Sequence, residues 1–157
     1  MAKKVFVIGI DQMILPLTKI LADQGCIPNI KKLIDNGASN QALQSFPAWT
    51  TTNWATISTG ADTGTHCVFS WLIDMPNGKT VSPFHSAGVN AETIWEAAEK
   101  QGLKSAVIHY PASMPSKLKE GYVIDGDATP EFGGSRYEIT HSETYTNIQA
   151  ITGTSIV

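Results

Sequence analysis

KVFVIGI, residues Lys4–Ile10, is a nearly continuous apolar run rich in valine and isoleucine. Such a run predicts a parallel strand in the middle of a sheet, buried on both faces. KSAVIHY, at Lys104–Tyr110, has the same character, and Tyr122–Ile124 is a third and shorter strand of this kind. Gln41–Phe46 is a further candidate strand.

Four helical segments are predicted around these strands, because glycine closely follows each of them. They are residues 16–23, the stretch from Pro28 to Gly37, residues 50–59, and residues 91–101 with Asn90 as N-cap. Residues 74–86 contain proline, asparagine and glycine and are predicted to form a loop or hairpin. Strands that alternate with helices predict an α/β fold with a mostly parallel sheet flanked by helices. The strands are fewer than such a sheet usually has, so we expect an incomplete sheet from this chain.

Composition limits the classes of protein to which the chain can belong. It has 157 residues, of which 42% are hydrophobic and 16% charged, and its net charge is -3. This predicts one folded domain or part of one, and argues against a nucleic-acid coat. No apolar run reaches the roughly 20 residues of a membrane span. The first apolar run ends at Asp11 without a signal-peptide cleavage site, which favours a cytoplasmic location.

Asp11 directly follows the first predicted strand. In open α/β sheets, ligands bind beyond the carboxyl ends of the strands. An acid at this point suits a metal ligand, a general base or a ribose-binding group, and it also suits a helix cap. VIGIDQM around Asp11 lacks the second and third glycines of the GxGxxG fingerprint, which argues against a dinucleotide site.

Thr50 lies at the predicted start of a helix, where free backbone amides and the helix dipole favour anions. Its hydroxyl can attack phosphorus if a metal ion lowers its pKa. Asn53 can direct its amide at the same anion. The alternatives are that Thr50 is an ordinary N-cap and that Asn53 completes a loop. From Phe46 to Gly78 there is no Lys or Arg, so a phosphate here needs backbone amides or metal ions.

Three blocks of sequence occur in a characteristic order: GIDQ, then IPNIKKLIDNGA, then SFPAWTTTNWATISTGADTGTH. In the third block Thr50 precedes Gly60 by ten positions, and His66 closes the loop that follows. Together they resemble the type I phosphodiesterase/nucleotide pyrophosphatase family of the alkaline phosphatase superfamily. A later stretch, ETIWEAAEKQGLKSAVIHYPAS, also resembles this family, so the resemblance covers roughly residues 3 to 130.

The resemblance implies an alkaline-phosphatase-like fold, of which residues 1–157 would be the amino-terminal part of a single catalytic domain. It implies that Asp11 binds a metal ion and that Thr50 is both nucleophile and metal ligand. Asn53 would hold a phosphoryl oxygen. Two divalent metal ions, of the zinc type, would bind with their remaining ligands outside this chain. The implied reaction is hydrolysis of a phosphodiester, nucleotide pyrophosphate or related phosphate ester, a small-molecule or nucleotide substrate, through a phosphothreonine.

The chain also departs from the family pattern. Gln12 and Cys67 stand where the family usually has glycine, and the Asp-His dipeptide of the later metal ligands is absent. Asp62 and His66 form an Asp-x-x-x-His pair, but in the wrong block, and we interpret the match as chance. Two alternatives therefore stay open: a phosphonate-cleaving relative, and a non-catalytic binding module without a complete metal site. We also expect association through an exposed sheet edge.

Overall fold

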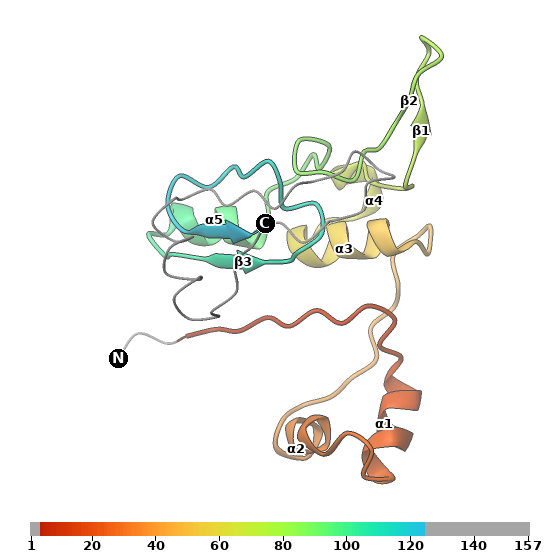
Figure 1. Cartoon of the computed structure of the whole chain (residues 1–157), viewed down its shortest axis with the longest axis vertical. Coiled ribbons are helices and arrows are strands. Elements are labelled where there is room, and N and C mark those ends of the chain that lie inside the picture. The colour runs from red at the N-terminus through yellow and green to blue at the C-terminus, as the bar shows by residue number, and fades with distance from the viewer. Residues whose placement is uncertain (1–3, 125–157) are drawn as a thin grey trace, which may run out of the picture. The chain divides into compact units, whose positions relative to one another are not determined.

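The computed structural model describes residues 4–124, which fall into two compact units that divide between Gln44 and Ser45 (Figure 1). The described residues contain five helices and two two-stranded sheets, so the fold is mixed α/β. The helices are α1 (Leu15–Asp23), α2 (Pro28–Asn36), α3 (Thr50–Thr59), α4 (Thr63–His66) and α5 (Ile94–Lys100). The strands are β1 (Ile73–Asp74), β2 (Thr80–Val81), β3 (Ala106–Ile108) and β4 (Tyr122–Ile124). None of the helices among these residues is long and apolar enough to cross a membrane.

The first unit contains α1 and α2, and both predicted helices are confirmed. Each begins with proline in its first turn, where the missing N–H costs no helical hydrogen bond. Lys31 of α2 forms ion pairs with Asp23 at the end of α1 (3.1 Å) and with Asp35 one turn later in α2 (2.9 Å). The ion pair with Asp23 joins the two helices at the surface, whereas the one with Asp35 lies within α2.

The predicted strands at residues 4–10 and 41–46 are wrong in this structure, because neither segment belongs to a sheet. Val5 is 83% exposed and Leu43 is 98% exposed. A strand forms only with a neighbour that accepts and donates its ladder hydrogen bonds, and the described part of the first unit holds no other strand. At the end of the second segment, the Ser45 N–H donates instead to the side chain of Asn53.

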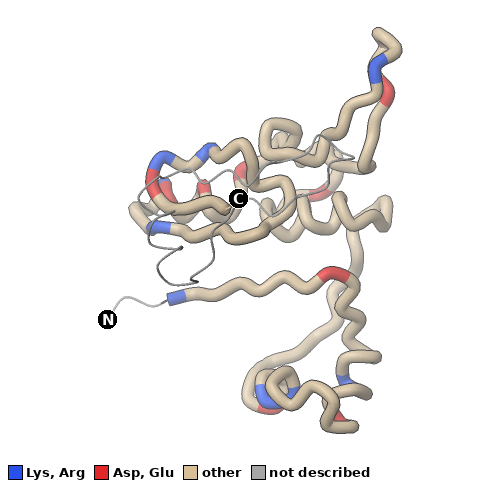
Figure 2. Tube along the Cα trace, in the orientation of Figure 1, with Lys and Arg blue, Asp and Glu red and all other residues tan. Residues whose placement is uncertain are grey.

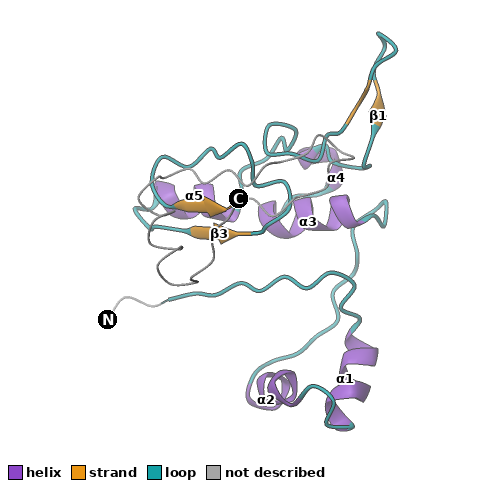
Figure 3. Cartoon of the chain, in the orientation of Figure 1, coloured by secondary structure: helices purple, strands orange, loops and turns teal. Residues whose placement is uncertain are grey.

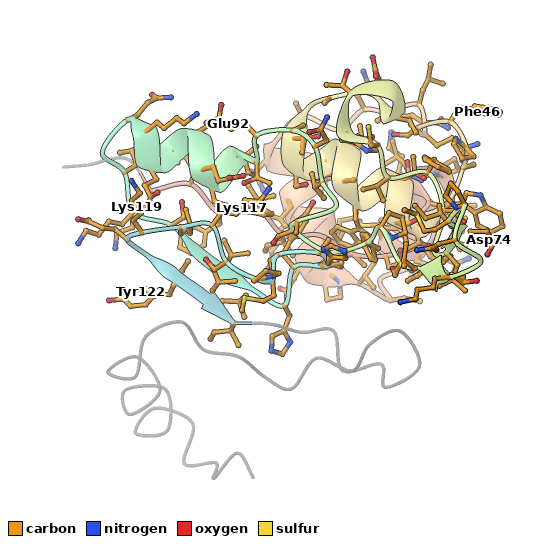
Figure 4. All side chains as sticks on the ribbon, turned by 90° about the horizontal axis from the view of Figure 1, so that it is seen from above. Phe46, Asp74, Glu92, Lys117, Lys119 and Tyr122 are labelled. Atoms are coloured by element: carbon orange, nitrogen blue, oxygen red, sulfur yellow. The ribbon has the colours of Figure 1, made fainter. Side chains whose placement is uncertain are left out.

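In the second unit β3 and β4 pair in parallel, with Val107 beside Val123 (Figure 3). Both valines are buried against Trp95 of α5, which confirms the predicted strand–helix layer. Figure 4 shows α5 on one side of the two strands and Tyr122 on the other. On that other side Ile108 is 62% exposed. The predicted sheet is thus shown only in part, since one pair is parallel and β1–β2 is an antiparallel hairpin.

Helix α5 begins at Ile94 rather than at the predicted residue 91. Its N-cap is Thr93, whose hydroxyl accepts from the Glu96 N–H while the Glu96 carboxylate accepts from the Thr93 N–H. This reciprocal capping box satisfies two backbone donors at once, which Asn90 alone does not do.

Tyr110 connects the two apolar clusters of the second unit. Its ring packs edge-on against Trp54 of α3 and against Trp95 of α5, each at a centroid distance of 5.1 Å. Its hydroxyl donates to the Trp54 carbonyl (2.9 Å). One cluster is the one around Trp95, Val107 and Val123. The other surrounds Ala55 and Val68 and includes the edge-on aromatic pair Trp71–Phe84. Helix α3 is therefore fixed on the β3–β4 layer.

Candidate active site at the start of helix α3

The predicted helix over residues 50–59 is confirmed, and Thr50 is its first residue. Trp49 before it has an extended backbone and makes no side-chain cap bond. The Trp49 side chain therefore does not cap the free amides of the first turn, which begin at Thr50. Gly60 ends the helix in the left-handed conformation, with φ of 66°. The half-buried Thr50 hydroxyl thus lies at the positive end of a ten-residue helix dipole.

The charge around this helix start is low. Figure 2 shows neither Lys nor Arg along α3 and α4, in agreement with the absence of both from Phe46 to Gly78. The hydroxyls of Thr51 and Thr52 are buried and have no hydrogen-bond partner among the described residues. The segments α3 and α4 themselves therefore offer a phosphate only backbone amides and hydroxyls, and no cationic side chain.

Asn53 lies one turn after Trp49 and connects the helix to the segment before it. Its Nδ2 donates to the Trp49 carbonyl (2.9 Å), and its Oδ1 accepts from the Ser45 N–H (3.0 Å). The structure therefore shows the loop-completing role for Asn53. One Nδ2 hydrogen stays uncommitted, and the contact of Asn53 with a phosphoryl oxygen stays a prediction.

Asp11 is exposed and lies in the turn that follows residues 4–10. It belongs to the first unit and Thr50 to the second, so a metal site that joins them stays a prediction. Within residues 4–124 no three His, Cys, Asp or Glu side chains are grouped to hold a metal ion. The donor types themselves, a carboxylate and a hydroxyl oxygen, suit a divalent cation.

His66 is completely buried, and both ring nitrogens are engaged. Nε2 lies 3.0 Å from the Thr56 hydroxyl, and Nδ1 accepts from the Val68 N–H at 3.1 Å. Burial lowers the pKa of His66, and the nearby Asp62 carboxylate opposes this shift only partly. Asp62 itself caps α4 by accepting from the Thr65 N–H (2.9 Å). The Asp-x-x-x-His pair is therefore a helix cap and a buried hydrogen-bonding histidine.

The sequence interpretation missed the polar network around His66, since it treated this residue only as the end of a loop. The network joins residues 45, 56, 66 and 68, whose burial no local pattern reveals. A usable signal existed in the run of threonines and serines on a helix without charged residues, which predicts buried hydroxyls.

Comparison with known protein families matches residues 5–150 to the family described as Type I phosphodiesterase / nucleotide pyrophosphatase. The matched stretch contains Asp11, Thr50 and His66 and spans most of the 157 residues. No curated protein and no solved structure gives a match. With a helix-start threonine in a cation-poor setting and a family match over most of its length, the chain belongs to the type I phosphodiesterase/nucleotide pyrophosphatase family.

Proposed function

We propose that this chain supplies the nucleophile of a metal-dependent hydrolase that cleaves phosphodiester, nucleotide pyrophosphate or related phosphate-ester bonds. Family membership supports the class of hydrolase. The observation that supports the nucleophile is Thr50 itself, half-buried at the uncapped start of α3. A hydroxyl at a helix N-terminus can approach a phosphoryl group while the first-turn amides bind its oxygens.

In the proposed reaction, the Thr50 Oγ forms a bond to phosphorus while the bond from phosphorus to the leaving oxygen breaks. The leaving alcohol or nucleotide takes the proton that the hydroxyl gives up. Water then cleaves the Oγ–P bond and restores Thr50, which completes hydrolysis through a phosphothreonine. Asn53 would contribute its uncommitted Nδ2 hydrogen to a phosphoryl oxygen.

Asp11 and Thr50 are the residues that would hold divalent metal ions, with further ligands from outside residues 4–124. When bound, two ions of the zinc type supply the positive charge that lowers the pKa of a threonine hydroxyl and neutralises a phosphoryl group. The absence of Lys and Arg between Phe46 and Gly78 is consistent with this proposal. The side chains would position the substrate, and the metal ions would neutralise its negative charge.

The test is Thr50→Ala in the complete enzyme, assayed on bis(p-nitrophenyl) phosphate with zinc or manganese. Turnover should be lost while the unfolding midpoint changes little, because alanine removes only the hydroxyl and the methyl of a half-buried side chain and is itself a strong helix former. Thr80→Ala is the matched control, since among residues 4–124 the Thr80 hydroxyl binds only Asp74, within the exposed hairpin. Mass spectrometry of acid-quenched wild type should find phosphate on the peptide that contains Thr50. Full turnover in Thr50→Ala would refute the assignment.

Two alternatives give different results in the same experiments. A phosphonate-cleaving relative would lose activity in Thr50→Ala but would prefer phosphonates over phosphodiesters. A non-catalytic binding module would show neither turnover nor a phosphorylated peptide, and would not bind zinc stoichiometrically.

A further inference from the structure

The segment that leads into the proposed nucleophile is held by side chains from two helices. We define Ser45–Trp49 as the entry segment. Asn53 of α3 binds its first N–H and its last carbonyl, at 3.0 and 2.9 Å. The Thr63 hydroxyl, at the start of α4, donates to the Phe46 carbonyl at 2.6 Å. Three backbone groups of a five-residue segment thus bond to side chains just before Thr50.

A second set of bonds connects the entry segment to the interior. The Ser45 hydroxyl donates to the Thr56 hydroxyl oxygen (2.8 Å), and the same oxygen lies 3.0 Å from His66 Nε2. On the other side of the ring, Nδ1 accepts from the Val68 N–H. An Nδ1 that accepts is unprotonated, so the neutral ring carries its proton on Nε2 and donates it to Thr56.

Hydrogen bonds hold the backbone of His66 as well as its ring. Its N–H donates to the Asp62 carbonyl, and its own carbonyl accepts from the Asn90 N–H, both at 3.0 Å. Val68, which binds the ring, is completely buried in the core cluster around Ala55. The imidazole therefore cannot move without breaking buried hydrogen bonds, which is costly.

We propose that His66 is a positioning residue: its neutral ring holds Thr56 and Ser45, and these hold the entry segment so that Thr50 faces the substrate. The inference rests on the proposed role of Thr50 as nucleophile. Protonation at Nδ1 would place an N–H against the Val68 N–H and break the chain of bonds. Asp62 is the charged group that acts on the ring from α4, whereas the groups from α3 and the entry segment are hydroxyls.

The proposal is tested with Thr56→Val in the complete enzyme, which keeps the shape of the side chain and removes its hydroxyl. A displacement of the nucleophile by about 1 Å can lower the rate by as much as 100-fold. We expect kcat to fall about 10- to 100-fold with little change in KM. Thr56→Ser should restore kcat, since it retains the hydroxyl. Thr59→Val is the matched control on the same helix, because in the described part of the chain the Thr59 hydroxyl bonds only to the backbone of Ala55 and Ala61.

Two further readouts do not depend on activity. Amide hydrogen exchange of residues 45–49 should speed up in Thr56→Val and stay at the wild-type rate in Thr56→Ser and Thr59→Val. The ¹⁵N signals of His66 should show the Nε2–H tautomer. These signals should stay unchanged as pH falls through 6.5, the ordinary pKa of histidine. If Thr56→Val does not fold, Ser45→Ala breaks the same chain at its half-buried end.

The outcomes separate the two proposals. Retained turnover in Thr50→Ala would refute the nucleophile, and the exchange and tautomer data would still decide whether His66 anchors the segment. Unchanged exchange at residues 45–49 in both Thr56→Val and Ser45→Ala would overturn the anchoring. Faster exchange with unchanged kcat, in an enzyme that needs Thr50, would overturn the positioning role. An Nδ1–H tautomer of His66 would also overturn it.

Discussion

Gly88 is the position where one added methyl group tests the packing of the second unit most severely. A Cβ atom built on Gly88 would lie 2.1 Å from the Pro83 carbonyl oxygen and 2.9 Å from its carbon. Ordinary van der Waals contact begins at 3.4 Å, so one backbone stretch has to move by more than 1 Å. The Pro83 carbonyl accepts from the His85 N–H, and Phe84 between them is a core residue. We expect Gly88→Ala to lower the free energy of unfolding by about 3 kcal/mol, the upper part of the overpacking range.

Gly78→Ala is the comparison that identifies the cause. Gly78 has φ of +76° and open space around its Cβ position, so alanine there costs about 1–2 kcal/mol of left-handed strain. Gly88 is not in the left-handed region, so reasoning from backbone conformation alone predicts the opposite order of stability. Urea denaturation followed by circular dichroism measures both variants through their midpoints. A Gly88→Ala variant at least as stable as Gly78→Ala would refute the steric argument.

Two further predictions concern single side chains. Cys67→Gly should raise the free energy of unfolding by about 0.5–1 kcal/mol. Cys67 has a strained φ of 63°, and glycine removes this strain at a smaller entropic cost. A urea midpoint at or below that of wild type would contradict this expectation. Tyr110→Phe should cost about 1 kcal/mol through the lost bond to Trp54. Burial raises the pKa of Tyr110 from 10.0 to about 12. The stabilisation of the fold by the Tyr110 hydroxyl is therefore complete below pH 10 and declines as pH rises toward 12. Phenolate absorbance at 295 nm that includes Tyr110 already near pH 10 would show that this reasoning is wrong.

Helices were predictable here because their signals are local. Pro16 and Pro28 open α1 and α2, and Gly60 ends α3 at the predicted residue. The start of α5 was misplaced although the sequence held a better signal, since Thr93 and Glu96 have the spacing of a capping box. Local chemistry thus predicted four of the five described helices: the short α4 was missed, and the start of α5 was misplaced where two caps competed.

Strands depend on partners that the local pattern does not contain. The runs at residues 4–10 and 104–110 look alike in sequence, yet only the second contains a strand, β3, which pairs with β4. For the site, Gly60 predicted the end of the helix over residues 50–59, and the ten-residue spacing from Thr50 to Gly60 supported the family resemblance. The sequence could not predict the hydrogen bonds of Ser45 and His66 to Thr56. These bonds join residues 11 and 10 positions apart, which meet only in the folded chain.

Two of the departures from the family pattern share one backbone geometry. Gln12 and Cys67 stand where the family usually has glycine, and their φ values are 56° and 63°. Glycine adopts this conformation without steric cost, whereas another residue pays roughly 1–2 kcal/mol. Both residues therefore adopt a backbone conformation in which glycine is the unstrained residue: one follows Asp11, and the other ends α4 just before the core residue Val68. A residue other than glycine at these φ values lowers stability locally, and because both positions have the conformation that suits glycine, the two replacements do not weigh against membership of the family.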